Sequence, residues 1–121
     1  MAHPRKEKFN KDDVKLAKIA RALAHPARVA IIRHLAGNDP CCFSEISKHL
    51  PLSDSTVSQH MSELRSAGLI KASYELPKII YSLDEDEWKN ARKLLKIFSK
   101  MKPLKGRNEK ILSSFRAFFH S

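Results

Sequence analysis

The stretch from Ser53 to Gly68 constrains the fold of this chain more than any other segment. Ser53 or Asp54 can cap a helix by accepting a hydrogen bond from a free backbone N–H, and Gly68 can take the left-handed conformation that ends one. Between these ends, apolar residues recur at spacings of three and four, at Val57, Met61 and Leu64. The pattern predicts a helix of about four turns with a buried back.

The other side of this predicted helix is rich in short polar side chains. Hydroxyl, amide and imidazole groups lie near its start, on Ser55, Thr56, Ser58, Gln59 and His60. A helix that enters the major groove of DNA reads base edges from its N-terminal end, where such groups can contact bases or phosphates. An ordinary surface helix with a polar face is the alternative. The pattern favours a DNA-reading helix.

Size and charge point to the same partner. A chain of 121 residues suits one domain, and a formal net charge of +10 attracts polyanions through counterion release. An anionic membrane surface is the alternative, but no apolar run is long enough to span a bilayer and the N-terminus lacks a signal-peptide pattern. We therefore expect a cytoplasmic protein that binds nucleic acid and no membrane.

The N-terminal part of the chain divides into an arm and two helices. Residues 1–10 are polar and basic and predict a flexible arm. An apolar face predicts a helix from about Asp12 to Ala24, which His25-Pro26 interrupts because proline disfavours helix before it and suits the first turn of the next helix. The second helix is predicted to end at Gly37.

The middle of the chain predicts a helix-turn-helix followed by a hairpin. A short third helix carries apolar residues between Phe43 and Leu50, and Pro51-Leu52 leaves only a tight turn before the reading helix. Beyond that helix, Leu69–Tyr74 and Lys78–Leu83 have strand-like composition and flank Glu75-Leu76-Pro77, which predicts a two-stranded wing.

A long helix is predicted from Asp84, with Glu87 in a capping-box position. Its apolar stripe is suited to packing along another helix and comprises Trp88, Ala91, Leu94, Leu95, Phe98 and Met101. We expect residues 11–102 to form the domain. We expect residues 103–121 to form a C-terminal amphipathic helix that packs on this long helix.

Four stretches together resemble the ArsR/SmtB family of bacterial transcriptional repressors. They are Ala22–Arg28 (ALAHPAR), Leu52–His60 (LSDSTVSQH), Leu64–Ile70 (LRSAGLI) and Tyr81–Leu83 (YSL). With the intervening spacing, the resemblance covers roughly residues 14 to 101, and the combination is specific although each piece alone is weak.

The resemblance implies a mainly α fold with a small β-hairpin wing, that is, a winged helix-turn-helix. It also implies a homodimer through the first helix and the long helix, bound to palindromic double-stranded operator DNA until an effector is sensed. The residues expected at the dimer interface are Leu16, Ile19, Leu23, Trp88, Ala91, Leu94, Leu95 and Phe98.

The resemblance further implies which residues contact DNA. The expected set is Ser53, Ser55, Thr56, Ser58, Gln59, His60, Arg65, Lys71 and Lys78. Gln59 is best suited to a bidentate contact with adenine, and the hydroxyls and Arg65 suit phosphates. His60 has packing against the helix-turn-helix as its alternative. The wing departs from the family, whose hairpin tip is commonly basic, because Lys71 and Lys78 are the only cations near it.

The effector expectation rests on two adjacent cysteines, which are expected to be reduced thiols. Family sensors often carry a Cys-x-Cys pair, whose matching positions here are Cys42 and Ser44, with Cys41 as an extra donor. A soft metal or metalloid at Cys41 and Cys42, a ligand set shared with the dimer partner, and a redox switch are open interpretations. A structural role is the fourth. No cofactor is certain, and a zinc site on the long helix is not expected because no histidine lies between Asp84 and Met101.

Two other classes of function are weighed. An enzyme is not expected, because no third group could orient a cysteine–histidine pair and the three glycines form no phosphate loop. The alternative to a regulator is a winged-helix module for nonspecific DNA or protein binding, without effector sensing.

Overall fold

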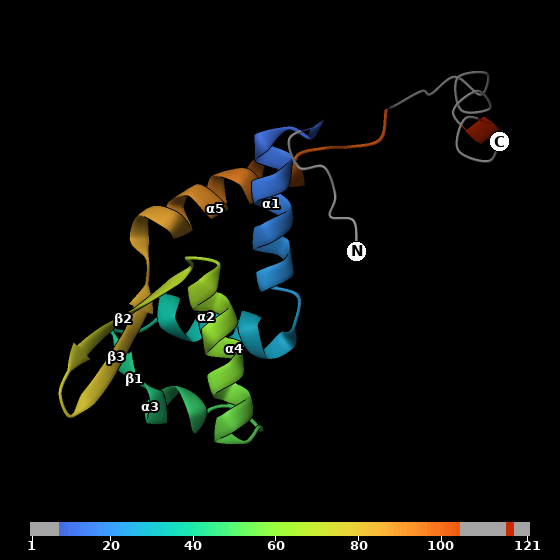
Figure 1. The fold of residues 1–121 in the computed structure, drawn as a ribbon. Helices are drawn as coiled ribbons and strands as arrows, with labels where there is room; N and C mark the ends of the chain where they lie inside the picture. Colours follow the sequence, from blue (N-terminus) through green and yellow to red (C-terminus); the bar gives the residue numbers. More distant parts are fainter. Residues whose placement is uncertain (1–7, 105–115, 118–121) are drawn as a thin grey trace.

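The computed structural model describes residues 8–104 and 116–117, and within them it is mainly helical (Figure 1). The helices and strands follow one another as α1 (Lys11–Ala22), α2 (Pro26–Ala36), β1 (Cys41–Cys42), α3 (Phe43–Ser47), α4 (Asp54–Ser66), β2 (Ile70–Glu75), β3 (Lys78–Leu83) and α5 (Glu85–Ser99). This order confirms the predicted winged helix-turn-helix. Most of the predicted arm and of the predicted C-terminal helix lies outside the described residues.

Side-chain caps set where the first two helices begin. The side chain of Asn10 accepts from the backbone N–H of Asp12 at 2.7 Å and starts α1. The ring Nδ1 of His25 accepts from the backbone N–H of Ala27 at 3.0 Å, and proline occupies the first turn of α2. At the predicted break between the two helices, His25 therefore caps the start of α2 and Pro26 occupies its first turn.

The reading helix α4 has the predicted ends. Ser53 accepts from the backbone N–H of Thr56 at 3.3 Å and caps its start. At its other end Gly68 has a φ of 80°, the left-handed conformation that glycine adopts without strain. The cap at Ser53 and the left-handed Gly68 therefore set the two ends of α4, one after the turn of the helix-turn-helix and one before the wing.

The sheet has three strands where the sequence predicts two. Its order is β1-β3-β2, and both pairings are antiparallel. The hairpin runs from the pair Ile70 and Leu83 at its base to the pair Glu75 and Lys78 at its tip. The added strand β1 pairs Cys41 with Tyr81, so the cysteines belong to the wing sheet.

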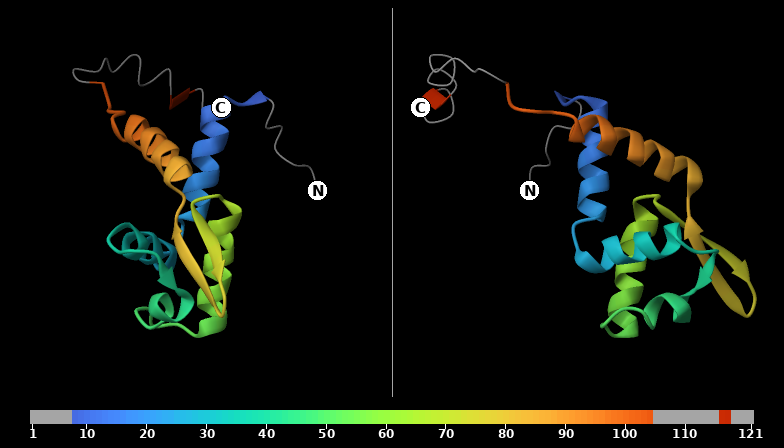
Figure 2. Two further views of the ribbon diagram at one scale, coloured as in Figure 1. Left: turned by 90° about the vertical axis from the view of Figure 1, so that its left-hand side faces the viewer. Right: turned by 180° about the vertical axis from the view of Figure 1, so that it is seen from behind.

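The core forms where α2 packs against α4 and against β3. Its most deeply buried large side chains are Ile31, Ile46, Val57, Leu64 and Leu69. α1 and α5 lie side by side at one end of the described fold, whereas α3 and the start of α4 lie at the opposite end (Figure 2). Among the described residues, no helix combines the length and the apolar character needed to cross a bilayer.

Candidate nucleic-acid interface

The start of α4 presents a polar surface on a fixed support. Ser55, Ser58 and Gln59 are exposed, whereas Val57 on the same turns is fully buried. The hydroxyl of Ser53 lies 2.9 Å from that of Thr56 and 3.2 Å from that of Ser55. Ser53 and Thr56 therefore also hold the cap, and Ser58 and Gln59 project beyond it.

A hydrogen bond between α3 and α4 fixes the turn of the helix-turn-helix. The hydroxyl of Ser47, which is buried, donates to the carboxylate of Asp54. This contact ties down the one acidic side chain in the first turn of α4. Sequence reasoning gave Asp54 only a capping role and missed its partner, because the two residues face each other only after the turn has formed.

His60 lies behind the reading surface, which decides between its two predicted roles. Its side chain is 9% exposed, and its Nδ1 accepts a hydrogen bond from the Nε–H of Arg28 at 3.1 Å. Its ring lies 4.3 Å from that of His25, centroid to centroid. His60 comes three residues after Val57 and four before Leu64, so it shares their buried face. We correct the expectation of a DNA contact to a packing role.

The remaining predicted cations divide between two places. Lys78 on β3 lines a cleft of about 650 Å³ together with Ser55 and Ser58 of α4, so the wing and the start of the reading helix face a common space. Arg65 and Lys71 are exposed at the other end of α4 and on β2. Arg65 lies ten residues beyond Ser55, which is about 15 Å along a helix.

Large apolar side chains are exposed at and near the tip of the wing. Leu76 is 86% exposed, and Tyr74 and Ile79 are also exposed. The cation Lys78 at the tip lies across the ladder from the acid Glu75. The Glu75–Lys78 pair therefore adds no net positive charge at the tip of the wing.

The two cysteines occupy different environments on β1. The thiol of Cys41 donates to the carbonyl of Asp39 at 3.0 Å and lies 3.6 Å from Nε2 of His34. The thiol of Cys42 lies 3.2 Å from the hydroxyl of Ser44. Neighbouring residues of a strand point to opposite faces, which disfavours a single two-thiolate site within one protomer. Within residues 8–104 and 116–117, no group of three potential metal ligands converges.

The two thiols also differ in acidity. Burial raises the pKa of Cys41, and the carboxylate of Glu45 adds to that effect. The hydrogen bond from Ser44 lowers the pKa of Cys42, and the backbone of Glu45 contributes in the same direction. Cys42 is therefore the better candidate for a thiolate. It lines the same cleft as Ser55, Ser58 and Lys78.

Six predicted dimer residues belong partly or wholly to the core of one protomer. Ile19 and Ala91 are buried within it, and four others pack against it: Leu23, Trp88, Leu94 and Leu95. We correct the expectation for Ile19 and Ala91, which are covered before any partner binds. Phe98 is 56% exposed, and Ile97, which the sequence analysis omitted from the stripe, is 54% exposed. The outer parts of the stripe thus remain uncovered in this structure.

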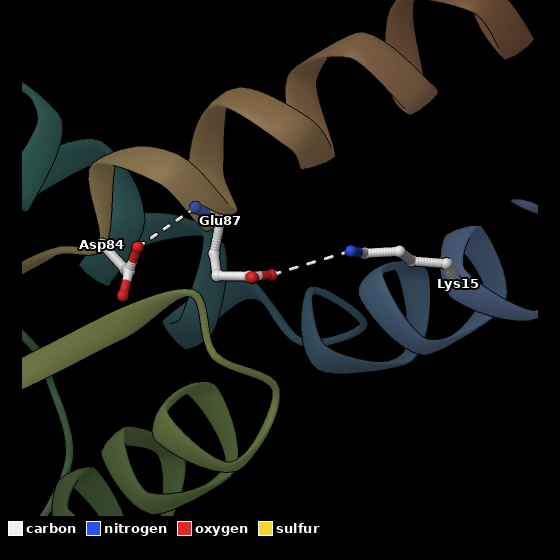
Figure 3. A network of polar contacts seen from close by, with 3 residues as sticks. All are labelled: Lys15, Asp84 and Glu87. Carbon is white, nitrogen blue, oxygen red and sulfur yellow. Dashed lines mark hydrogen bonds and ion pairs between the residues drawn. The ribbon is translucent and has the colours of Figure 1, made fainter.

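A polar network joins the two helices of the predicted dimer interface (Figure 3). The carboxylate of Asp84 accepts from the backbone N–H of Glu87 at 3.1 Å and caps α5. The side chain of Glu87 does not close a capping box, because the backbone N–H of Asp84 donates to the carbonyl of Leu69. The carboxylate of Glu87 instead lies 3.9 Å from Nζ of Lys15 on α1. The pair is about half exposed, so it contributes little energy, but it indicates how α1 and α5 meet.

Comparison with known proteins gives a consistent assignment. The family model described as "Bacterial regulatory protein, arsR family" matches residues 25–72, from the start of α2 into β2. The HTH-type transcriptional regulator CmtR of Mycobacterium tuberculosis is 42% identical over 69 residues, which are 56% of this chain and 57% of CmtR. The chain thus spans little more than half the length of that relative.

Two further proteins extend the similarity. The transcriptional activator HlyU of Vibrio cholerae is 32% identical over 89 residues, which are 74% of this chain and 82% of HlyU. Its solved structure superposes with a TM-score of 0.61 at 27% identity and covers 76% of this chain and 100% of that chain. A homodimeric winged helix-turn-helix DNA-binding domain from Mycobacterium bovis gives a TM-score of 0.61 at 22% identity. That match covers 83% of this chain and 92% of the other chain. At that identity it shows the fold alone.

Proposed function

The chain belongs to the arsR family of bacterial regulatory proteins, and on that premise we propose that it is a homodimeric transcriptional regulator that binds a palindromic operator through α4. Its named relatives are transcriptional regulators and not enzymes, in agreement with the sequence analysis. A regulator of transcription acts where the DNA is, so we also propose a cytoplasmic location.

One observation carries the proposal: α4 exposes Ser55, Ser58 and Gln59 on its first turns while its back is locked into the core. A helix that reads the major groove needs both a rigid support and hydrogen-bonding groups at its N-terminal end. We propose base contacts for Gln59, and phosphate contacts for Ser53, Ser55, Thr56, Ser58, Arg65, Lys71 and Lys78.

The homodimer is supported by an uncovered apolar surface. On α5, Phe98 and Ile97 are more than half exposed, and Met101 just beyond it is 68% exposed. α1 lies alongside, with Leu16 and Leu23 only partly buried. The domain from Mycobacterium bovis with the same fold is homodimeric. A dimer through α1 and α5 would place two α4 helices for the two halves of a palindrome.

The direction of regulation is proposed as repression, although HlyU is named an activator. A bound protein represses where its operator overlaps the site at which transcription starts, and activates where it displaces a repressor or recruits the polymerase. Whether the protein represses or activates therefore depends on where the operator lies in the promoter. The geometry of α4 is compatible with repression and with activation. A winged-helix module without sequence preference remains the competing function.

For the effector, we propose a thiol signal at Cys42 and not a metal shared by Cys41 and Cys42. Adjacent side chains of a strand point to opposite faces, and the described residues hold no group of three potential metal ligands. Cys42 instead lies in the cleft with Ser55 and Lys78 and has a lowered pKa. Its thiolate would attack a peroxide oxygen, the O–O bond would break, hydroxide would leave, and a sulfenic acid would form beside the start of α4.

A binding selection tests the function as a whole. The full chain is presented with a pool of random DNA duplexes, and the recovered duplex is then compared with random DNA. A regulator should favour the recovered duplex by roughly a thousandfold or more. Equal affinity for both would reject the operator proposal in favour of the nonspecific module. Repeating the assay with peroxide, persulfide, arsenite, zinc and copper tests the effector class.

A further inference from the structure

We infer that Arg28 is a positioning residue for DNA reading: its guanidinium ties the end of α1 to α4 by donating to a neutral His60, and acidification releases that tie. The inference rests on the proposed function and deepens it, because it names the contact that holds the reading helix α4 in place relative to α1 and α2. Neither Arg28 nor His60 is among the proposed DNA contacts.

The bridge has three ends. The Nε–H of Arg28 donates to Nδ1 of His60 on α4 at 3.1 Å. Its Nη1 donates to the carbonyls of Arg21 and Ala22 at the end of α1, both at 3.4 Å. Carbonyls at the end of a helix lack partners within it, and a cation is favoured there by the helix dipole. One side chain of α2 therefore connects three helices.

The bond to His60 exists in one protonation state only. A neutral imidazole can accept through Nδ1 when its proton is on Nε2, but a protonated imidazole is a donor at both nitrogens. His25 uses its own Nδ1 in the same way, to cap α2 through the backbone N–H of Ala27. Two rings that both act as acceptors thus lie 4.3 Å apart beside a guanidinium.

The charges around His60 favour its neutral form. Burial lowers its pKa most, and His25 and Arg28 on the α2 side lower it further. Glu63 on its own helix opposes them. From α1, the contacts of the bridge are the backbone carbonyls of Arg21 and Ala22, which do not titrate. The bridge is therefore intact at neutral pH and opens when acid protonates the ring.

The sign of the change in DNA affinity on acidification distinguishes the Arg28–His60 bridge from a general effect of positive charge. Protonating histidines adds positive charge, and positive charge alone strengthens binding to DNA. The bridge predicts the opposite, since protonated His60 would face the guanidinium without an acceptor and α4 would lose its tie to α1. A loss of affinity on acidification therefore points to the bridge.

The test uses the full chain and the duplex recovered by selection. Arg28→Lys keeps the charge but loses the planar fork that reaches both His60 and the carbonyls. Arg33→Lys is the matched control, because Arg33 is exposed on the same helix and makes no side-chain hydrogen bond to the described residues. His60→Asn keeps an acceptor at the δ position but cannot titrate. Circular dichroism at each pH verifies folding.

We expect Arg28→Lys to weaken binding at pH 7.5 by roughly tenfold, with an unchanged slope of log affinity against log salt, and Arg33→Lys to match the wild type. Wild-type affinity should fall between pH 7.5 and 5.5, and His60→Asn should remove most of that fall. The inference is overturned if wild-type affinity is flat or rises, or if His60→Asn follows the wild-type profile. The pH profiles of the wild type and of His60→Asn test the inference even if Arg28→Lys fails to fold. A wild type without sequence preference at pH 7.5 instead rejects the proposed function, and the inference with it.

Discussion

The backbone N–H of Asp84 donates to the carbonyl oxygen of Leu69 across 3.0 Å. Leu69 follows Gly68, where α4 gives way to the wing, and Asp84 caps α5. The start of the helix with the exposed apolar stripe is thus held by backbone to the end of the reading helix. In the proposed dimer, a shift of α5 would reach α4 through this bond without crossing a flexible linker.

The first prediction concerns the dimer. Phe98→Glu places a charge on the exposed part of the stripe and should weaken dimerisation by at least about thirtyfold, the effect of losing an interface anchor worth about 2 kcal/mol. Leu94→Glu should do the same but also lower stability, because Leu94 packs partly against the core of its own protomer. Sedimentation velocity over a range of concentrations measures the effect.

Lys96→Glu is the matched control, because Lys96 is exposed on the opposite side of α5. It should sediment as the wild type does. If Phe98→Glu remained a dimer at the same concentrations, the proposed interface through α1 and α5 would be rejected.

The second prediction concerns base reading. Gln59→Ala should reduce the preference for the selected duplex over random DNA by roughly ten- to a hundredfold, since a bidentate base contact is worth about 1–3 kcal/mol. Binding to random DNA should change little. Ser58→Ala is the comparison, because loss of a phosphate contact weakens binding to all sequences alike. Equal losses on both duplexes for Gln59→Ala would contradict its role as a base reader.

The third prediction separates the two thiols. Cys42→Ser should leave DNA binding intact and make it insensitive to peroxide, whereas Cys41→Ser should keep the response, because the pKa of the Cys41 thiol is raised and that of the Cys42 thiol is lowered. Fluorescence anisotropy with labelled duplex, before and after peroxide, measures the response, and mass spectrometry locates the added oxygen. Retained sensitivity in Cys42→Ser would remove the proposal.

The sequence predicts best those parts of the fold that depend on residues close together in the chain. α4 is predicted nearly to its ends, because the cap at Ser53, the apolar spacing and Gly68 are all local. β1 is missed, because two residues are too short to show an alternating pattern. Glu87 illustrates an intermediate case: its spacing from Asp84 predicts a capping box, but the backbone N–H of Asp84 donates to Leu69 and the side chain of Glu87 lies near Lys15 on α1.

The site is predicted less fully than the fold. Exposed Ser58 and Gln59 follow from the helical period alone. The partner of His60 does not, because Arg28 is 32 residues away and only the packing of α2 on α4 brings them together. The same holds for the cleft that unites Lys78 with Ser55. Local patterns predict which face a residue occupies, but not what it meets there.

The fourth prediction tests the end of α4. Gly68→Ala should destabilise the protein by about 1–2 kcal/mol, because a Cβ is disfavoured at positive φ. The cause is the backbone and not a clash, since the new Cβ would meet Cγ of Glu87 at an ordinary 3.6 Å. Gly37→Ala is the control: φ there is −95°, so it should be neutral or stabilise by up to about 1 kcal/mol. Urea unfolding measures both, and equal effects would reject the explanation.

The fifth prediction concerns stability in acid. The pKa of His60 in the folded chain lies below its usual 6.5, chiefly because of burial. Between pH 6.5 and that lowered value the unfolded chain binds more protons, so the free energy of unfolding falls as the pH falls, by at most about 1.4 kcal/mol per pH unit from this group. Above pH 6.5 the group contributes no slope. His60→Asn should flatten the curve between pH 6.5 and 5.0 relative to the wild type, as measured by urea unfolding at half-unit steps. Parallel curves for the two proteins would show that His60 titrates as it does in the unfolded chain.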